Sequence, residues 1–383
     1  MSTVEDKLTC PSLRWRAGST ATLWFTGSLA KLFLKLGART EVHGLDEFVK
    51  LLDERMDIEK RTSGLLTVSN HLSVVDDPMI WGLLPYRHLR PDNIRWSLGS
   101  YDICFKNGSY SILSQYFSLG QTLPTHRKNH SKYGGIFQPT ITQCIRLLSA
   151  GPFTQPTPPH DQWELRSSST KGVHNLPDPF TDPTFTYSTT GTDIYPAPSA
   201  YGTRRHAWIH IFPEGRVHQH PDRTMRYFKW GVARLILESE PCPTVVPIWH
   251  EGADEIMHEE RGFPRFLPRL NKKVEVVFGE PVSETVWRGV RERWRKLKER
   301  EVQRDHVCQG EEFEYLNDEL RYGREARELR MEVAFKVRQE LLKLPRARGK
   351  AEEDPKAGMW DTYREEGRRR EGKMDDDSWV KDM

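Results

Sequence analysis

The chain has little of what marks a metal centre or a disulfide-stapled fold. Its five cysteines are scattered through 383 residues and none forms a Cys-x-x-Cys pair, so neither a zinc knuckle nor a disulfide framework is expected. Histidines crowd the region from His206 to His220. A strand there would hold His206 and His210 too far apart for one metal ion, and no His-Glu-x-x-His motif supports them. We therefore expect no catalytic metal.

Long hydrophobic runs are also missing. No stretch of about 18 or more uncharged apolar residues exists, so a conventional membrane-spanning helix is not expected. Within residues 17–36, however, apolar side chains recur at helical spacing, with Trp24 and Lys31 as potential anchors. This pattern is typical of a helix that lies in a membrane interface, although a helix packed against the domain would look similar. The apolar face would comprise Leu23, Trp24, Leu29, Leu32, Phe33 and Leu36.

An excess of charge of one sign is absent as well. The formal net charge is only +3, from 57 basic and 54 acidic residues, which gives no support to nucleic acid as a partner. Positive charge is instead local, at residues 87–95 and 126–132, where it could contact phosphate and anionic lipid or simply line solvated loops. The mean hydropathy of −0.68 is low for a compact globule, which indicates that part of the chain is solvated or disordered.

Short apolar runs alternate with helical patterns, which predicts an α/β fold with a mixed central sheet flanked by helices. Strands are expected at residues 65–69, 93–98, 119–123, 207–212, 244–249 and 274–278, and helices from 77 and over 136–148 and 228–237. We expect four regions: a membrane-associated segment at 1–40, a catalytic domain at 41–285 with a mobile Pro/Ser/Thr-rich insertion at 151–206, a charged helical region at 286–344, and a disordered tail at 345–383.

The most informative motif is a histidine and an aspartate at His-x-x-x-x-Asp spacing, directly after the apolar run at 65–68. The two residues are His71 and Asp76. Histidine is the side chain best able to take a proton near neutral pH, and a carboxylate on its other ring nitrogen makes it an oriented general base. This spacing alone is common by chance. Its position at a strand end, together with a second motif, gives it weight.

The second motif is Phe-Pro-Glu-Gly-Arg at residues 212–216, which follows another predicted strand. Its glycine permits close backbone approach to a ligand. Taken alone it could be an ordinary strand-to-loop turn. Because residues of one site commonly meet at the carboxyl ends of strands in α/β sheets, we expect the two motifs to lie together.

Together these motifs resemble the glycerolipid acyltransferase family, which carries His-x-x-x-x-Asp in its first motif and Phe-Pro-Glu-Gly in its third. A closer match, to one group of enzymes within this family, rests on residues 70–78, 211–216, 228–236 and 246–250. The resemblance covers roughly residues 15–150 and 206–285. The insertion and the C-terminal tail lie outside it, and a surface insertion should leave the chemistry intact.

The resemblance implies a role for each matching residue. His71 would act as general base, and Asp76, selected by the family spacing over the neighbouring Asp77, would orient it. Asn70 and Ser73 would support them, with Ser73 engaged in local hydrogen bonding rather than acting as a nucleophile. Substrate contacts, either to phosphate or around the acceptor pocket, would come from Arg127, Phe212, Pro213, Glu214, Gly215, Arg216 and Pro247.

Within the family, the resemblance is to phospholipid–lysophospholipid transacylases that remodel cardiolipin in mitochondrial membranes. It implies monolysocardiolipin as acceptor, phosphatidylcholine as donor, and no cofactor, since coenzyme A is not needed. It also implies a monotopic or interfacial attachment to the inner and outer membranes, facing the intermembrane space. Two alternatives stay open: an acyl-CoA-dependent lysophospholipid or glycerol-3-phosphate acyltransferase, and a non-catalytic membrane-binding scaffold. Residue chemistry alone does not separate the two acyl donors.

Overall fold

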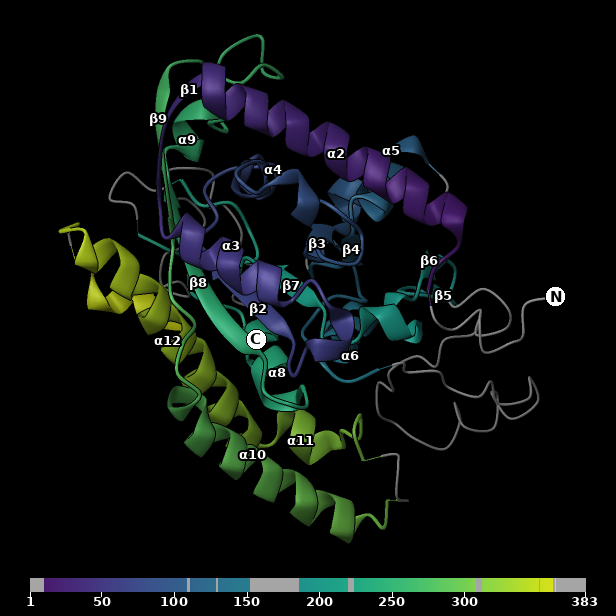
Figure 1. The fold of residues 1–383 in the computed structure, drawn as a ribbon. Coiled ribbons are helices and arrows are strands. Elements are labelled where there is room, and N and C mark those ends of the chain that lie inside the picture. Colours follow the sequence, from purple (N-terminus) through teal and green to yellow (C-terminus); the bar gives the residue numbers. More distant parts are fainter. Residues whose placement is uncertain are drawn as a thin grey trace.

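A five-stranded mixed sheet forms the centre of the molecule. The computed structural model describes residues 10–108, 111–128, 130–151, 186–219, 224–307, 312–350, 352–360 and 362. The strands are β1 (Ala38–His43), β2 (Leu65–Ser69), β7 (Trp208–Ile211), β8 (Thr244–Glu251) and β9 (Lys272–Phe278), and their order in the sheet is β1-β9-β8-β2-β7 (Figure 1). β8 and β9 are antiparallel, whereas the other neighbouring pairs are parallel. The predicted mixed sheet is therefore confirmed.

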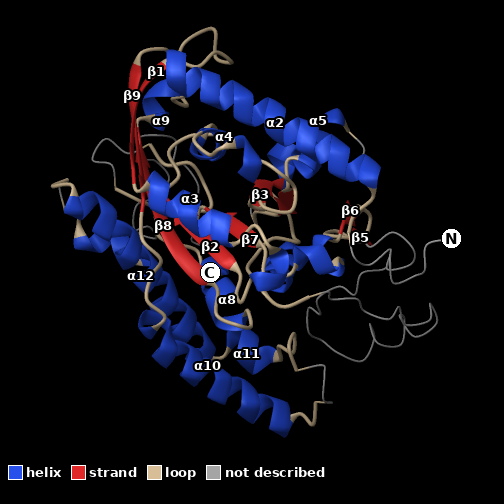
Figure 2. Ribbon diagram, in the orientation of Figure 1, coloured by secondary structure: helices blue, strands red, loops and turns tan. Residues whose placement is uncertain are grey.

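Helices cover both faces of this sheet (Figure 2). One face packs against α2 (Leu13–Leu36), α3 (Leu45–Glu54) and α4 (Asp76–Gly82); the other packs against α6 (Pro139–Leu148), α8 (Gly231–Glu238), α10 (Thr285–Arg304), α11 (Asp318–Tyr322) and α12 (Arg324–Ala347). Side chains alternate between the two faces of a strand. Leu65 of β2 accordingly joins the first core and Leu66 the second. A strand buried on both faces reads as the continuous apolar run seen in the sequence.

Smaller elements lie beside β7, which is one edge strand of the five-stranded sheet. β3 (Ser97–Ser100) and β4 (Thr122–Thr125) form a parallel pair, and a bridge from Trp96 to Ile209 connects them to β7. Both strands begin a few residues later than predicted. The remaining elements are the π-helix η3 (Tyr101–Phe105), α5 (Ile112–Leu119), the antiparallel pair β5 (Thr186–Tyr187) and β6 (Tyr195–Pro196), α9 (Ala253–Ile256), and the 3-10 turns η1 (Ile58–Lys60), η2 (Tyr86–His88), η4 (Pro198–Ala200), η5 (Gly202–Arg204) and η6 (Pro355–Gly358).

The N-terminal helix is present, but the apolar face expected for it is divided between two sides. Leu23 and Leu34 are buried in the core, whereas the outward side carries exposed Leu13, Trp24, Phe25, Leu29, Leu32 and Leu36. Small residues allow the close approach of α2 to α4, since a Cβ added at Gly82 would lie 2.7 Å from the Cβ of Ala30. The expected boundary at residue 40 falls inside β1, so α2 is part of the folded domain. Among the described residues, no helix is long and apolar enough to span a membrane.

The second part of the expected mobile insertion is folded. Residues 186–206 form β5, β6, η4 and η5, and Tyr187 and Tyr195 are buried with Phe105. Polar residues of this segment hydrogen-bond to one another, because the Asp193 carboxylate accepts from Ser188 Oγ (2.6 Å) and from the backbone amides of Thr189 and Thr190. The expected boundary at 206 is therefore corrected. Residues 152–185 of the predicted insertion lie outside the described residues.

The C-terminal region is helical, as expected, and its helices α10 and α12 pack into the catalytic domain instead of standing apart from it. Residues that were assigned to a charged helical region contribute to the same core as α6 and α8, namely Trp287, Val290, Trp294, Leu297, Leu329, Val333, Val337 and Leu341. α12 continues to Ala347, beyond the expected start of the tail. The segment at 352–360, after α12, is attached to the domain, because Glu353 pairs with the buried Arg338 and accepts a hydrogen bond from the Met225 amide (2.8 Å). The tail therefore begins later than 345; residues 363–383 lie outside the described part.

Candidate active site

The two sequence motifs meet at the carboxyl ends of β2 and β7. These strands are parallel neighbours, so His71 and Phe212, which follow them, come to the same edge of the sheet. The His71 amide donates a 2.8 Å hydrogen bond to Glu214 Oε1, across 143 residues of sequence. The rings of His71 and Phe212 stack with centroids 4.2 Å apart. The expectation that the motifs lie together is borne out by this geometry.

Asp76 holds the imidazole of His71 in one orientation. The distance from His71 Nδ1 to Asp76 Oδ2 is 2.9 Å, and the same oxygen accepts the backbone amides of Leu72 (2.6 Å) and Ser73 (2.8 Å). Asp76 is only 1% exposed. Because a carboxylate only accepts, Nδ1 carries the proton, and Nε2 presents its lone pair. His71 keeps 21% of its side chain exposed, and its Nε2 has no partner within the described ranges. This is the geometry that an oriented general base requires.

Asp77, the neighbouring alternative, points elsewhere. Its carboxylate pairs with Arg95 and accepts a hydrogen bond from Trp81 Nε1 (2.7 Å). Burial raises the pKa of Asp77, but the charge of Arg95 and its hydrogen bonds outweigh burial and bring the pKa below its ordinary value. Asp77 is therefore engaged in a structural ion pair, and the spacing that selects Asp76 agrees with the contacts.

Glu214 fastens the second motif to the first. Its Oε1 accepts the His71 amide and its Oε2 accepts the Arg226 amide, each at 2.8 Å. The side chain is 2% exposed, and burial raises its pKa to about 7, against the opposing effect of the two backbone hydrogen bonds. Gly215 follows with φ of +66°, a conformation that favours glycine, and a Cβ there would lie 3.0 Å from the Lys229 side chain. In this structure Glu214 shapes the site through the backbone of His71.

Asn70 and His250 join the turn at residues 70–77, here called the catalytic turn, to β8. Asn70 Nδ2 donates to His250 O (2.8 Å), and Asn70 Oδ1 accepts from the His250 amide (3.1 Å). The ring of His250 returns a third contact, from Nε2 to Asn70 O at 2.7 Å, and this nitrogen lies 3.7 Å from Asp76 Oδ2. The role of His250 was not predicted. The signal that could have found it is its place near the end of a strand parallel to β2.

The other predicted site residues occupy different surroundings. Ser73 Oγ donates to Met257 O (3.3 Å), a contact across 184 residues of sequence rather than the local hydrogen bond expected of this side chain; the Ser73 amide does bond locally, to Asp76. Pro247 is buried within β8, where it accepts a hydrogen bond from the Gly279 amide (2.9 Å). Arg127 pairs with Asp102 of η3. Pro213 is buried beside Phe212, and Arg216 is partly exposed just beyond Gly215.

A cavity of about 240 Å³ opens beside both motifs. Its walls come from the catalytic turn, from the chain after Arg216, and from the loop between α9 and β9; the lining residues are Val74, Val217, Met257, Glu259, Arg261 and Arg265. None of the predicted substrate contacts is among them. Sequence reasoning missed this loop because it contains no catalytic pattern.

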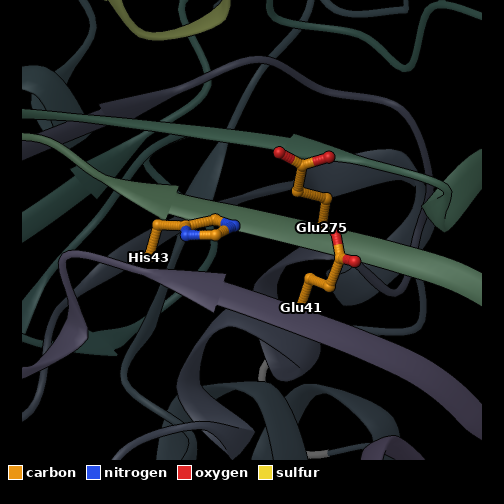
Figure 3. Close-up of side chains that lie close together, drawn as sticks. All are labelled: Glu41, His43 and Glu275. Carbon is orange, nitrogen blue, oxygen red and sulfur yellow. The ribbon is translucent and has the colours of Figure 1, made fainter. Parts of the chain in front are cut away.

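One group of side chains could be considered for a metal. Glu41, His43 and Glu275 bring their ligand atoms within 4.8 Å of one another on β1 and β9 (Figure 3). Basic side chains already neutralise both carboxylates: Lys273 pairs with Glu41 (2.8 Å), and Arg348 and Lys350 pair with Glu275. The group therefore suits an ion-pair network at the sheet edge, and we assign no metal to it.

Comparisons with known proteins identify the class. No family model matches the chain. Tafazzin of Saccharomyces cerevisiae is 35% identical over 365 residues, which cover 89% of this chain and 81% of that protein. N-acylphosphatidylethanolamine synthase of Arabidopsis thaliana is 30% identical over 67% of each chain. The crystal structure of the 1-acyl-sn-glycerophosphate acyltransferase PlsC from Thermotoga maritima has 13% sequence identity and a TM-score of 0.37, and the match covers 80% of this chain and 88% of that one.

An aspartate-oriented histidine at the edge of a mixed sheet, together with these sequence relatives, defines the protein as an acyltransferase that acts on phospholipids. More narrowly, the chain belongs to the tafazzin family.

Proposed function

We propose that the protein is a CoA-independent transacylase that moves an acyl chain from phosphatidylcholine to monolysocardiolipin and so remodels cardiolipin. The observation that carries this proposal is the 2.9 Å contact between His71 Nδ1 and Asp76 Oδ2, which prepares Nε2 to accept a proton. The identity to yeast tafazzin supports the assignment.

In the proposed reaction, His71 Nε2 takes the proton from the free hydroxyl of the lysophospholipid. The hydroxyl oxygen attacks the ester carbonyl of the donor phospholipid and forms a tetrahedral intermediate. The imidazolium, stabilised by Asp76, then gives its proton to the departing glycerol oxygen. One ester bond forms and one breaks, so the products are an acylated acceptor and a new lysophospholipid. General base catalysis of this kind contributes about 10²–10⁴ in rate.

Phosphate contact is proposed for Arg127 and Arg216. Of the two predicted contacts, Arg216 is favoured because it directly follows the turn formed by Glu214 and Gly215. Arg127 lies just after β4, where it pairs with Asp102 of η3.

Membrane attachment is proposed through the outward side of α2, which Figure 1 shows along the outside of the molecule with α5 beside it. Ser19 Oγ donates to Leu119 O (2.7 Å), and Thr26 shares a hydrogen bond with Tyr116, so the two helices present one surface. Ile112 and Leu113 of α5 add exposed apolar area to that of α2. Such a surface suits a monotopic protein in the interface. We propose that this surface attaches to mitochondrial membranes, facing the intermembrane space, and the resemblance to tafazzins supports that location.

The test uses the purified full-length protein on liposomes that contain monolysocardiolipin and acyl-labelled phosphatidylcholine, with coenzyme A absent. Label should enter cardiolipin with wild type and fall by about 10²–10⁴ with His71→Ala. His306→Ala, which alters an exposed histidine after α10, is the matched control and should retain transfer. Transfer only from added acyl-CoA would favour the CoA-dependent enzyme. Liposome binding without transfer from either donor would favour the scaffold.

A further inference from the structure

The loop at residues 257–271, between α9 and β9, exposes an unusual amount of apolar surface. The side chains of Phe263 and Phe266 are 90% and 73% exposed, and Leu267 and Leu270 are also exposed. Large apolar side chains gathered on one surface loop mark a contact site more often than chance. The loop therefore has the character of a surface that contacts another molecule or a membrane.

Arginines alternate with these apolar residues, and within the described residues they hydrogen-bond to backbone carbonyls. Arg261 donates to His258 O (2.6 Å), Arg265 to Glu259 O (2.5 Å) and Arg269 to Gly262 O (2.6 Å). These acceptors are neutral carbonyls, and across the described ranges no carboxylate forms an ion pair with the three guanidinium groups. Three arginines face only two glutamates, Glu259 and Glu260, in the loop. The loop can therefore offer positive charge to an anion.

Hydrogen bonds anchor the first residues of the loop to the catalytic turn. Met257 O accepts from Ser73 Oγ (3.3 Å) and from Gln219 Nε2 (3.4 Å). The same Gln219 amide nitrogen donates to Leu72 O (2.7 Å), and its oxygen accepts from the Glu259 amide (2.9 Å). The loop thus begins at a fixed position beside His71.

The other end of the loop is anchored to α2. The amide of Asn271 donates to Gly37 O (2.6 Å) at the C-terminus of that helix, and Figure 1 shows the loop at the top of the view beside this end. Arg261 and Arg265 also line the cavity next to Val74 and Val217. The loop therefore runs from the cavity by the catalytic turn to the C-terminal end of α2.

We propose that residues 257–271 form a membrane-inserting loop that recognises anionic phospholipid and sets the mouth of the cavity against the bilayer. Phe263, Phe266 and the two leucines would enter the interface, while the arginines contact lipid phosphates. This inference rests on the proposed function, because it assigns to that site the surface through which lipid arrives. A second copy of the chain is a poorer occupant, since a symmetric contact would bring two sets of arginines together.

The first test measures binding of the full-length protein to phosphatidylcholine vesicles prepared with and without cardiolipin. Phe263→Ser/Phe266→Ser should weaken binding to both vesicle types by at least tenfold, because two apolar side chains lose their contact with the interface. Arg265→Gln should weaken binding about fivefold on cardiolipin vesicles and leave phosphatidylcholine vesicles nearly unaffected. Phe335→Ser is the control, since this exposed residue lies on α12, which covers the sheet face opposite α2.

The second test is hydrogen exchange of the wild-type loop, which does not depend on any variant folding. Backbone amides of residues 257–271 should gain protection when cardiolipin vesicles are added. No added protection, together with unchanged binding of the double variant, would overturn the proposal. Protection that rises with protein concentration in the absence of vesicles would overturn it in favour of self-association.

His71→Ala separates this inference from the proposed function. The variant should bind vesicles like wild type while losing transfer. If wild type binds vesicles through the loop but transfers no acyl chain, the proposed function is wrong and the proposal of a membrane-inserting loop is upheld. If transfer occurs and the loop variants bind vesicles normally, the proposal of a membrane-inserting loop is wrong and the proposed function is upheld.

Discussion

The catalytic turn at residues 70–77 and the loop at 257–271 touch each other, yet they are built in opposite ways. In the turn, the polar groups are buried and tied to one another: Asp76 accepts three hydrogen bonds on a single oxygen, and Asn70 is bonded on both sides of its amide. In the loop, aromatic side chains are exposed and arginines bond only to carbonyls.

The difference follows from what each region has to meet. An oriented base must hold its geometry to within a fraction of an ångström, and buried polar groups that hydrogen-bond to one another achieve this. A lipid surface is fluid and offers no fixed partner, so a loop that meets it gains from exposed apolar area and diffuse charge. Changes in the turn should therefore affect the rate of the chemical step, whereas changes in the loop should affect vesicle binding. The predictions below test that separation.

The largest effect is expected from Asp76→Asn. The amide keeps the shape of the carboxylate but not its charge, so the imidazolium that forms during transfer loses its stabilisation. We expect kcat on liposomes to fall by about 10²–10⁴ with vesicle binding retained. Asp77→Asn is the matched control: it breaks the pair with Arg95 and should lower the melting temperature while folded enzyme keeps its kcat. Equal losses of kcat in both variants would remove the distinction between the two aspartates.

Glu214 should make the stability of the turn depend on pH. Its pKa rises from an ordinary value of 4.5 to about 7 in the folded protein. The contribution of this group to stability is therefore fully present below about pH 4.5 and is lost as pH rises through 7. Over that window the loss is roughly 3 kcal/mol. Glu214→Gln does not titrate, so urea unfolding should show the stability of wild type falling relative to the variant between pH 4.5 and 7.5. Parallel curves for the two proteins would contradict the prediction.

His250 tests whether the turn depends on its support from β8. His250→Leu removes the donor to Asn70 O and leaves that buried carbonyl short of a partner, at about 1–3 kcal/mol. We expect kcat to fall about tenfold with little change in KM, since the base is misplaced and lipid binding is not. His250→Gln can return a donor to the same carbonyl and should recover most of the loss. No recovery would mean that His250 acts by its volume rather than by its hydrogen bond.

Much of the sheet was predictable because its central strands are buried on both faces. The apolar runs at residues 65–69, 244–249 and 274–278 predict β2, β8 and β9 with bounds within two residues of those observed. β1 was missed, since an edge strand that carries Arg39 and Glu41 has no such run, and its partner β9 lies more than 200 residues away. β4 begins later than expected because α5 takes Leu119 and Gly120 caps it.

The site was predictable where its residues form local motifs and not where they come from distant segments. His71, Asp76 and Glu214 belong to patterns that sequence spacing preserves, and the structure brings them together. His250 and the loop at 257–271 have no such pattern. Their relation to the turn exists only through strand pairing and through backbone carbonyls, neither of which leaves a mark on residue types.

Ser73 joins the two regions, and its removal gives the smallest expected effect. Ser73→Ala deletes the 3.3 Å hydrogen bond to Met257 O and leaves the Ser73 amide on Asp76 unchanged. The loss should be about 0.5–1.5 kcal/mol of stability. Because the base and its carboxylate stay in place, kcat should remain within a few-fold of wild type. If Ser73 were a nucleophile, its replacement by alanine would abolish almost all activity. Hydrogen exchange should rise in residues 257–271 before it rises in the turn, because the loop loses an anchor that the turn does not need.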